Sequence, residues 1–293
     1  MKYTAWVLVA LGLFSAPAAG AEHPSTNRHT GLVEIPLAGL RKAAEHGDRA
    51  ELGRQAARIG VARLARAMAD PDRGLVLAAL DSAPYAPGRL LLLEAVLARC
   101  DSADAPIRDR ALSMVGVLLD GADPEILEAW EVPNEIAQTA CRILAAAAGR
   151  TDRTLDARLA ALQSLADAGA LCAGKSDLSS LLRDPSPDIR RAGVLVISPT
   201  TPHALLALRE AIKDPDPGVA GAAGAALCRE QHLPRVKPPA PSRPWRELVV
   251  AQGTPVEDAA EMLTCLVEST DPSDAKTLES LRAKGSPMLL PKQ

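Results

Sequence analysis

The sequence predicts an all-α protein whose helices stack in pairs as a right-handed α-solenoid, with a helical cap at each end. Apolar residues fall at helical spacing, as at Ile136, Ala140 and Ile143, and almost nowhere alternate with period two. An Asp-Pro-x-Pro turn begins at Asp184 and again at Asp214, 30 residues later, and an apolar run follows each copy. A period near 30 with two helices per unit is typical of stacked helical hairpins.

Residues 1–21 are predicted to be a signal peptide. Lys2 is followed by the apolar run AWVLVALGLF, and Ala19-Gly20-Ala21 forms a small-x-small cleavage site. The apolar run is shorter than the ~20 residues that a spanning helix needs, which disfavours the alternative of a membrane anchor. We therefore expect an exported protein, periplasmic or secreted, with no transmembrane segment after cleavage. Residues 22–30 are expected to be a disordered linker.

The composition argues against nucleic acid as a partner. The formal net charge is −3, whereas nucleic-acid binding depends on neutralising phosphates with basic side chains. Beyond the signal peptide the only aromatic residues are Tyr85, Trp130 and Trp245. These are too few for a base-stacking platform or an aromatic-lined sugar groove.

Residues 31–69 are predicted to form an N-terminal helical cap of two helices, the second of them long and rich in arginine. Its basic residues are Arg49, Arg54, Arg58, Arg63 and Arg66. A basic amphipathic helix can lie on an anionic surface. Here Glu45, Asp48 and Glu51 dilute the charge, so a solvated face of a capping helix is the favoured interpretation.

Residues 70–232 are predicted to form the solenoid. Pro187 and Pro217 each stand at the first position of a helix, where the fixed φ and the missing N–H of proline are tolerated. Weaker copies of the same helix begin at Pro106 and Thr154. Two stiff prolines in a turn hold a helix pair at one angle and so permit regular stacking.

These units resemble HEAT repeats, in particular the short HEAT-like type of about 30 residues that is also found in phycobilin lyases. The family pattern places an Asp in the turn between the two helices and a basic residue six positions later, after a β-branched residue. Asp184 with Ile189-Arg190 fits the pattern. The other copies are Asp152 with Arg158 preceded by Ala157, Ser102 with Arg108, and Asp214, which has Ala220 in place of the basic residue. The resemblance extends over residues 70–230.

The turn residues are interpreted as structural rather than catalytic. A carboxylate at the start of a helix satisfies free N–H groups and complements the helix dipole. The arginine can bridge to the Asp of its own or of the neighbouring repeat. The residues given this role are Asp152, Arg158, Asp184, Pro187, Arg190, Asp214 and Pro217.

The C-terminal part is predicted to begin with a proline-rich linker at residues 233–253, extended along the surface. Docking to a proline-recognition module is the alternative. Residues 254–285 are predicted to form a C-terminal helical cap, opened by a capping box of Thr254 and Glu257. Residues 286–293 are a tail.

Five cysteines leave at least one thiol unpaired within a monomer. Cys228 and Cys265 flank the proline-rich linker and are the favoured pair for a disulfide. Cys141, in an alanine-rich run, is interpreted as a small buried apolar residue. The spacing fixes none of the possible pairings.

No catalytic grouping, cofactor motif or metal site is evident. Cys228 and His232 are four residues apart, but two ligands are too few for a metal ion. The HEAT resemblance implies a scaffold that binds another protein, in the cell envelope, through the concave face of the solenoid. The phycobilin-lyase resemblance implies the alternative, a lyase-like enzyme or accessory protein that binds a small molecule or chromophore. A structural envelope component is a third possibility.

Overall fold

The computed structural model describes residues 31–174, 177–197, 202–231, 244–269 and 272–283. Its contacts divide the chain into two units, residues 1–35 and 36–293, and the packing described here is that within the second unit. The described residues form helices and turns and no strand, so the predicted all-α class is confirmed. The predicted signal peptide, the 22–30 linker and the 286–293 tail lie outside the described residues.

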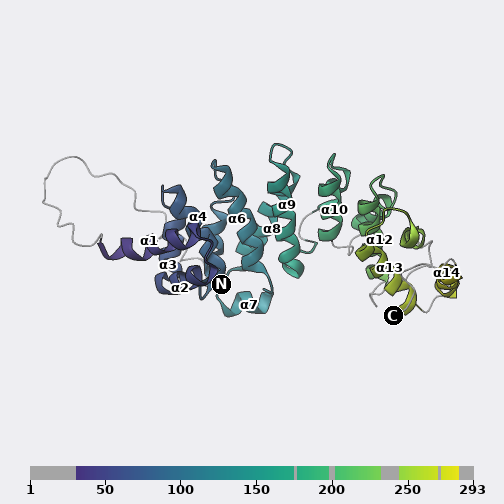
Figure 1. Cartoon of the computed structure of the whole chain (residues 1–293), viewed down its shortest axis with the longest axis horizontal. Helices are drawn as coiled ribbons and strands as arrows, with labels where there is room; N and C mark the ends of the chain where they lie inside the picture. Colours follow the sequence, from purple (N-terminus) through teal and green to yellow (C-terminus); the bar gives the residue numbers. More distant parts are fainter. Residues whose placement is uncertain (1–30, 175–176, 198–201, 232–243, 270–271, 284–293) are drawn as a thin grey trace, which may run out of the picture. The chain divides into compact units, whose positions relative to one another are not determined.

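The helices follow one another along the chain (Figure 1), and η denotes a 3₁₀ helix. In chain order they are α1 (Gly31–Glu45), α2 (Arg49–Ile59), α3 (Val61–Met68), α4 (Arg73–Ser82), η1 (Ala83–Tyr85), η2 (Arg89–Leu92), α5 (Leu93–Leu97), α6 (Ala105–Leu119), α7 (Pro124–Ala129), α8 (Asn134–Gly149), α9 (Leu155–Asp167), η3 (Gly169–Leu171), η4 (Ser179–Arg183), α10 (Pro187–Val196), α11 (Pro202–Ala211), α12 (Pro217–Gln231), η5 (Pro244–Val250), α13 (Val256–Glu268) and α14 (Pro272–Ala283).

The helices pack as pairs of sequence neighbours. The first helix of each pair contacts the second: α3 with α4, α5 with α6, α8 with α9, η4 with α10, and α11 with α12. The second helices also contact one another in order, α4 with α6, α6 with α9, α9 with α10, and α10 with α12. Each helix therefore buries its apolar side against its own partner and against the next pair.

Small residues allow the second helices to approach closely. A Cβ at Gly116 of α6 would lie 2.5 Å from the Cα of Ser164 of α9, so no larger residue fits there. The Ser164 hydroxyl is buried and donates to the carbonyl of Leu112 at 2.7 Å. The small side chains and this hydrogen bond together give a close, tightly packed contact between α6 and α9.

The N-terminal segment differs from its predicted form. The expected long second helix is wrong, because the chain forms α2 and α3 with a break at Gly60. Gly60 has φ 75°, in the left-handed region that glycine tolerates and other residues avoid. α3 packs on α4 across the predicted boundary at Asp70, so it serves as the first helix of a pair.

The proline-rich segment also departs from the extended linker that was predicted. Residues 233–243 lie outside the described residues, but η5 forms at 244–250 and places Trp245 in the core, 1% exposed. Trp245 belongs to the same apolar cluster as Met262 of α13. α13 begins at the expected place, yet Pro255 is its N-cap and no side chain caps it, so the predicted capping box does not form.

Two disulfides are present. Cys228 of α12 is joined to Cys265 of α13, with their Cα atoms 6.1 Å apart. Cys141 of α8 is joined to Cys172, which follows η3, with a Cα separation of 5.3 Å. The interpretation of Cys141 as a simple apolar residue was therefore wrong. The remaining cysteine, Cys100, is buried and unpaired.

None of the helices in the described ranges combines the length and the apolar character needed to cross a membrane.

The disulfide pattern predicts how the thiols react with an alkylating reagent. Burial raises the pKa of the Cys100 thiol to about 12, so it has almost no thiolate at neutral pH. We expect no label on the native protein, one label, on Cys100, after unfolding without reductant, and labels on all five cysteines after unfolding with reductant. Mass spectrometry counts the labels, and peptide mapping locates them. More than one label on the unfolded, unreduced chain would contradict this pattern.

Candidate functional site

Four of the turns between paired helices share one polar geometry. The side chain of the first turn residue accepts a hydrogen bond from the backbone N–H two positions later, at 2.8 to 3.2 Å. The residues that do this are Asp70, Ser102, Asp184 and Asp214. The copy at Asp70 is not among the turns that the repeat pattern predicted. Its Asp-Pro-Asp sequence was the available signal.

The residue two positions later is the N-cap of the second helix. Asp72, Asp104, Thr154 and Asp216 each accept a hydrogen bond from the N–H three residues further on. Ser186 is the N-cap of α10 but makes no such bond. Two polar side chains in the turn thus satisfy N–H groups that the helix itself leaves free. The predicted carboxylates at Asp184 and Asp214 therefore stand just before the capping residue.

Two arginines join successive turns. Arg190 donates through Nε and Nη2 to the two carboxylate oxygens of Asp214, at 2.7 and 2.9 Å, and through Nη1 to the carbonyl of Asp184 at 2.9 Å. Arg158 donates through Nη1 and Nη2 to the two carboxylate oxygens of Asp184 and through Nε to the carbonyl of Ala148 at 2.8 Å. Each arginine thus binds the carboxylate of the Asp in the next turn along the chain.

These two ion pairs are largely shielded from water. The side chains of Arg158 and Asp184 are 8% and 7% exposed, and those of Arg190 and Asp214 are 14% and 8% exposed. Burial acts to raise the pKa of Asp184, but hydrogen bonds from Arg158 and the Ser186 N–H outweigh it and lower that pKa. Burial likewise acts to raise the pKa of Asp214, but hydrogen bonds from Arg190 and the Asp216 N–H outweigh it and lower that pKa.

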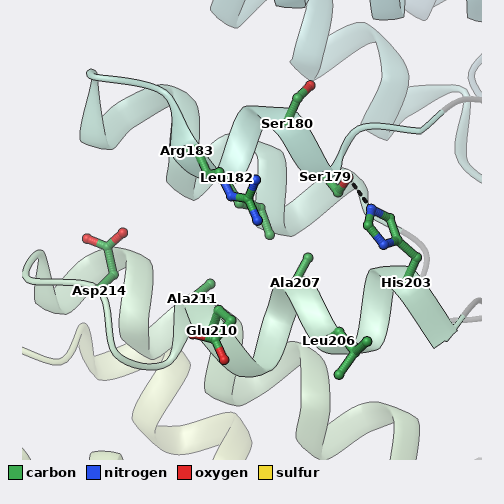
Figure 2. A pocket seen from close by; sticks show the side chains of 10 residues that line it. All are labelled: Ser179, Ser180, Leu182, Arg183, His203, Leu206, Ala207, Glu210, Ala211 and Asp214. Carbon is green, nitrogen blue, oxygen red and sulfur yellow. Dashed lines mark hydrogen bonds between the residues drawn. The ribbon is translucent and has the colours of Figure 1, made fainter.

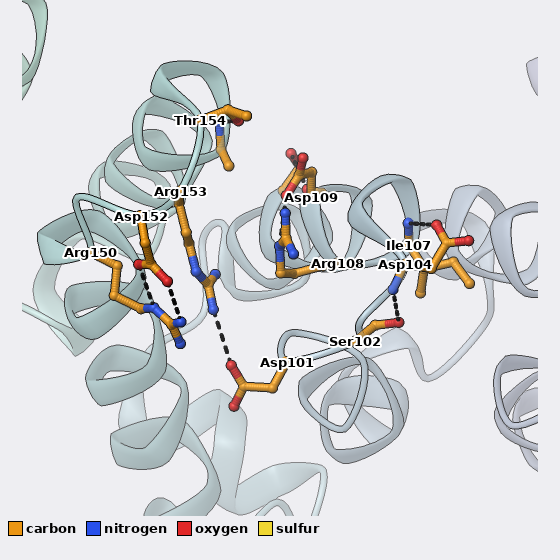
Figure 3. A network of polar contacts seen from close by, with 12 residues as sticks. Asp101, Ser102, Asp104, Ile107, Arg108, Asp109, Arg150, Asp152, Arg153 and Thr154 are labelled. Atoms are coloured by element: carbon orange, nitrogen blue, oxygen red, sulfur yellow. Dashed lines mark hydrogen bonds and ion pairs between the residues drawn. The ribbon is translucent and has the colours of Figure 1, made fainter.

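Asp152 does not join this series (Figure 3). Its carboxylate pairs with Arg150 at 2.6 Å on the surface, and this hydrogen bond lowers the pKa of Asp152 to about 2. The neighbouring Arg153 reaches back to Asp101, in the preceding turn, at 3.0 Å. The link between these two turns is therefore made by a different pair of residues, which the repeat pattern did not indicate.

Exposed pairs continue the connection toward the N-terminus. Arg41 contacts the N-cap Asp72 at 2.8 Å, and Arg73 contacts the N-cap Asp104 at 3.1 Å. In these pairs the arginine binds the capping carboxylate and not the first turn residue. They are about half exposed, so each contributes little to stability compared with the buried pairs.

An open groove of about 420 Å³ lies between η4 and α11 (Figure 2). Leu182, Leu206 and Ala207 form its apolar part, and Arg183 and Glu210 lie at its edge. Its volume is within the range of small-molecule sites. No Phe, Tyr or Trp is among the ten residues that line it, and its one aromatic ring is the imidazole of His203.

A serine, a histidine and an aspartate meet at one end of this groove. Ser179 donates to Asp177 at 2.6 Å, and Nε2 of His203 lies 3.0 Å from the Ser179 Oγ and 3.8 Å from an Asp177 oxygen. In a catalytic triad the serine and the carboxylate contact opposite ring nitrogens. Here both approach Nε2, and His203 and Asp177 are about 70% exposed. The group therefore lacks the arrangement that activates a nucleophile.

Across the described residues, no three His, Cys, Asp or Glu side chains gather as a metal site would require. Cys228, one of the two residues considered for a metal, is held in its disulfide. His232 lies outside the described residues.

No protein-family model matches the chain, and no curated protein matches it.

The buried and the exposed turn aspartates predict different mutational effects. Asp184→Ala leaves Arg158 buried without its counter-ion and removes the acceptor for the Ser186 N–H. We expect it to lower the free energy of unfolding by about 3–5 kcal/mol. Asp152→Ala is the matched control, since it removes an exposed pair, and we expect little change. Urea denaturation followed by circular dichroism measures both. Equal effects of the two substitutions would contradict the structural role of the buried pair.

The lowered pKa values also predict the acid dependence of stability. A carboxylate whose folded pKa lies below its unfolded value of about 3.9 stabilises the fold above that pH, and the contribution is lost as the pH falls through the folded value. The difference in free energy of unfolding between wild type and Asp184→Ala should therefore be largest near pH 7, about three pH units above the unfolded pKa. It should become smaller below about pH 4. Thermal melting of both proteins at a series of pH values measures this difference. A gap that stays constant into acid would show that the charge of Asp184 is not what stabilises the turn.

Proposed function

We propose that the protein is an exported HEAT-type α-solenoid that holds another protein of the cell envelope along its concave face. The observation that carries this proposal is the order of contacts among the second helices. α6, α9 and α10 each pack on the next, so their outer sides form a row built from successive repeats. Stacks of this kind serve as extended binding surfaces.

Equivalent positions in this row remain accessible to solvent. Counting nine residues from each N-cap reaches Asp81 in α4, Ser113 in α6, Gln163 in α9 and Leu195 in α10. Gln163 is exposed, and Leu195 is 54% exposed. One acidic, two neutral polar and one apolar side chain thus stand at the same distance from the N-cap of successive second helices. A partner that crosses several repeats would contact a specific series of side chains.

The contacts at the C-terminal end support a row of exposed second helices that ends before α12. Residues 219–228 of α12 are all buried, because η5 and α13 pack against this helix. Arg191 of α10 reaches Glu257 and Asp258 of α13, each at 3.2 Å. Terminal capping elements of this kind are what a stack of repeats requires for solubility. The proposed binding face therefore comprises α6, α9 and α10.

Site-specific crosslinking tests this proposal. A photo-reactive residue is placed at Gln163 or at Leu195 on the second-helix face, and at Leu206 on the first-helix groove as the control. We expect one envelope protein, identified by mass spectrometry, to crosslink at both Gln163 and Leu195 and not at Leu206. The chain recovered should begin at Glu22, as signal cleavage predicts. A crosslink at Leu206 alone would reject the proposed face. A coloured or small-molecule adduct without a protein partner would support the ligand-binding alternative.

A further inference from the structure

One repeat carries an additional segment. The first turn residues are 32 positions apart from Asp70 to Ser102 and from Asp152 to Asp184, and 30 apart from Asp184 to Asp214. From Ser102 to Asp152 the spacing is 50. Much of the surplus lies between the end of α6 and the start of α8, where the chain forms α7. Insertions in a repeat commonly lie on a binding surface, so this segment invites a functional explanation.

The inserted segment builds one wall of an apolar groove. The groove has a volume of about 360 Å³. Ile126 and Trp130 line it from the insertion, and Ala86, Gly88 and Leu90 line it from the preceding pair. A Cβ at Gly88 would lie 3.3 Å from a ring carbon of Trp130, so the indole rests against the backbone there.

Large apolar side chains at this groove are open to solvent. Trp130 is 47% exposed, Ile126 is 37% exposed, and the adjacent Leu91 is 49% exposed. By contrast Trp245 is buried in the core. Single exposed apolar residues are ordinary, but three together, including a tryptophan, are typical of a contact surface.

The charges around the groove select the kind of partner. Residues 120–135 contain six carboxylates and no lysine or arginine. They are Asp120, Asp123, Glu125, Glu128, Glu131 and Glu135. None of them forms an ion pair within the described part of the chain, although many other carboxylates of the protein do. Arg89 is the only basic residue in the groove lining, and it donates to the Asp120 carbonyl at 3.1 Å.

We propose that this groove docks a basic segment of another protein, with one apolar side chain of that segment against Trp130 and its cations facing the insertion's carboxylates. The apolar contact supplies affinity, and the uncompensated negative charge selects basic over acidic segments. The groove includes the buried Leu118 of α6, but the positions named above for the second-helix face, Ser113, Gln163 and Leu195, are not among its lining residues. Either proposal can therefore fail without the other.

Peptide titration tests the docking site. The probe is a synthetic peptide of lysine and leucine, and its control is the same peptide with every lysine replaced by glutamate. Binding is followed by the Trp130 emission, which should shift to shorter wavelength and become less accessible to a soluble quencher as the indole is covered. We expect the lysine peptide to bind, the glutamate peptide not to bind, and the affinity to fall as salt is added.

Variants separate the two contributions. Trp130→Ala should weaken binding of the dye-labelled lysine peptide about ten-fold or more. Glu125→Lys with Glu128→Lys should weaken it through charge alone, and both positions are exposed, so folding is retained. The matched controls are Leu206→Ala and Glu210→Lys, exposed residues of the α11 groove that should leave the affinity unchanged.

Three outcomes would overturn the proposal. The first is equal binding of the lysine and glutamate peptides, and the second is unchanged binding to both the Trp130 and the charge-reversal variants. The third is a concentration-dependent dimer, seen by analytical ultracentrifugation, that Trp130→Ala dissolves. That result would assign the groove to a second copy of this chain and not to a basic partner.

Discussion

The ordered packing of helix pairs depends on the polar turn between the two helices of each pair. One side chain in the turn fixes the backbone, the next caps the second helix, and an arginine from the preceding pair binds the turn's carboxylate. At Asp184 and Asp214 this carboxylate is buried, so the backbone contact and the arginine contact must form together or leave a charge without a partner. The alanine-rich helices also bury many leucines against one another, so apolar contacts hold the pairs together. We infer that the turns act beside these contacts by fixing the angle at which each pair meets the next.

Sequence patterns predicted the features that are local. Apolar periodicity and the prolines at first helical positions located α6, α9, α10, α11 and α12. Features that depend on distant contacts were not predictable. Cys141 and Cys172 show no spacing that marks a disulfide, and Gly60 becomes a helix break only because α3 must turn onto α4. Trp245 lies in a segment whose prolines indicated an extended chain, yet its large apolar ring is drawn into the core between α12 and α13.

The candidate sites differ in the chemistry they can support. The groove between η4 and α11 combines leucines with a half-buried Ser179 and the exposed His203 and Asp177, whose geometry does not suit nucleophilic catalysis. The second-helix row presents varied side chains at equivalent positions of successive helices, whereas the α7 groove combines exposed apolar side chains with the carboxylates of residues 120–135. Sequence reasoning noted Trp130 only as one of few aromatics. The carboxylates around it were visible in the sequence, but the sequence did not show that they form no ion pairs within the described part of the chain.

The positions of the disulfides have a topological consequence. Each bond closes a loop of the chain, one spanning residues 141–172 and the other 228–265. A protease that cuts once within either loop produces two polypeptides that stay covalently joined, so neither piece diffuses away. The second loop includes η5 and most of α13, which remain tethered to α12 after such a cut. In the oxidising, protease-rich surroundings proposed for this protein, a single cut in this loop therefore does not release the C-terminal elements. Their loss requires that the disulfide also be broken.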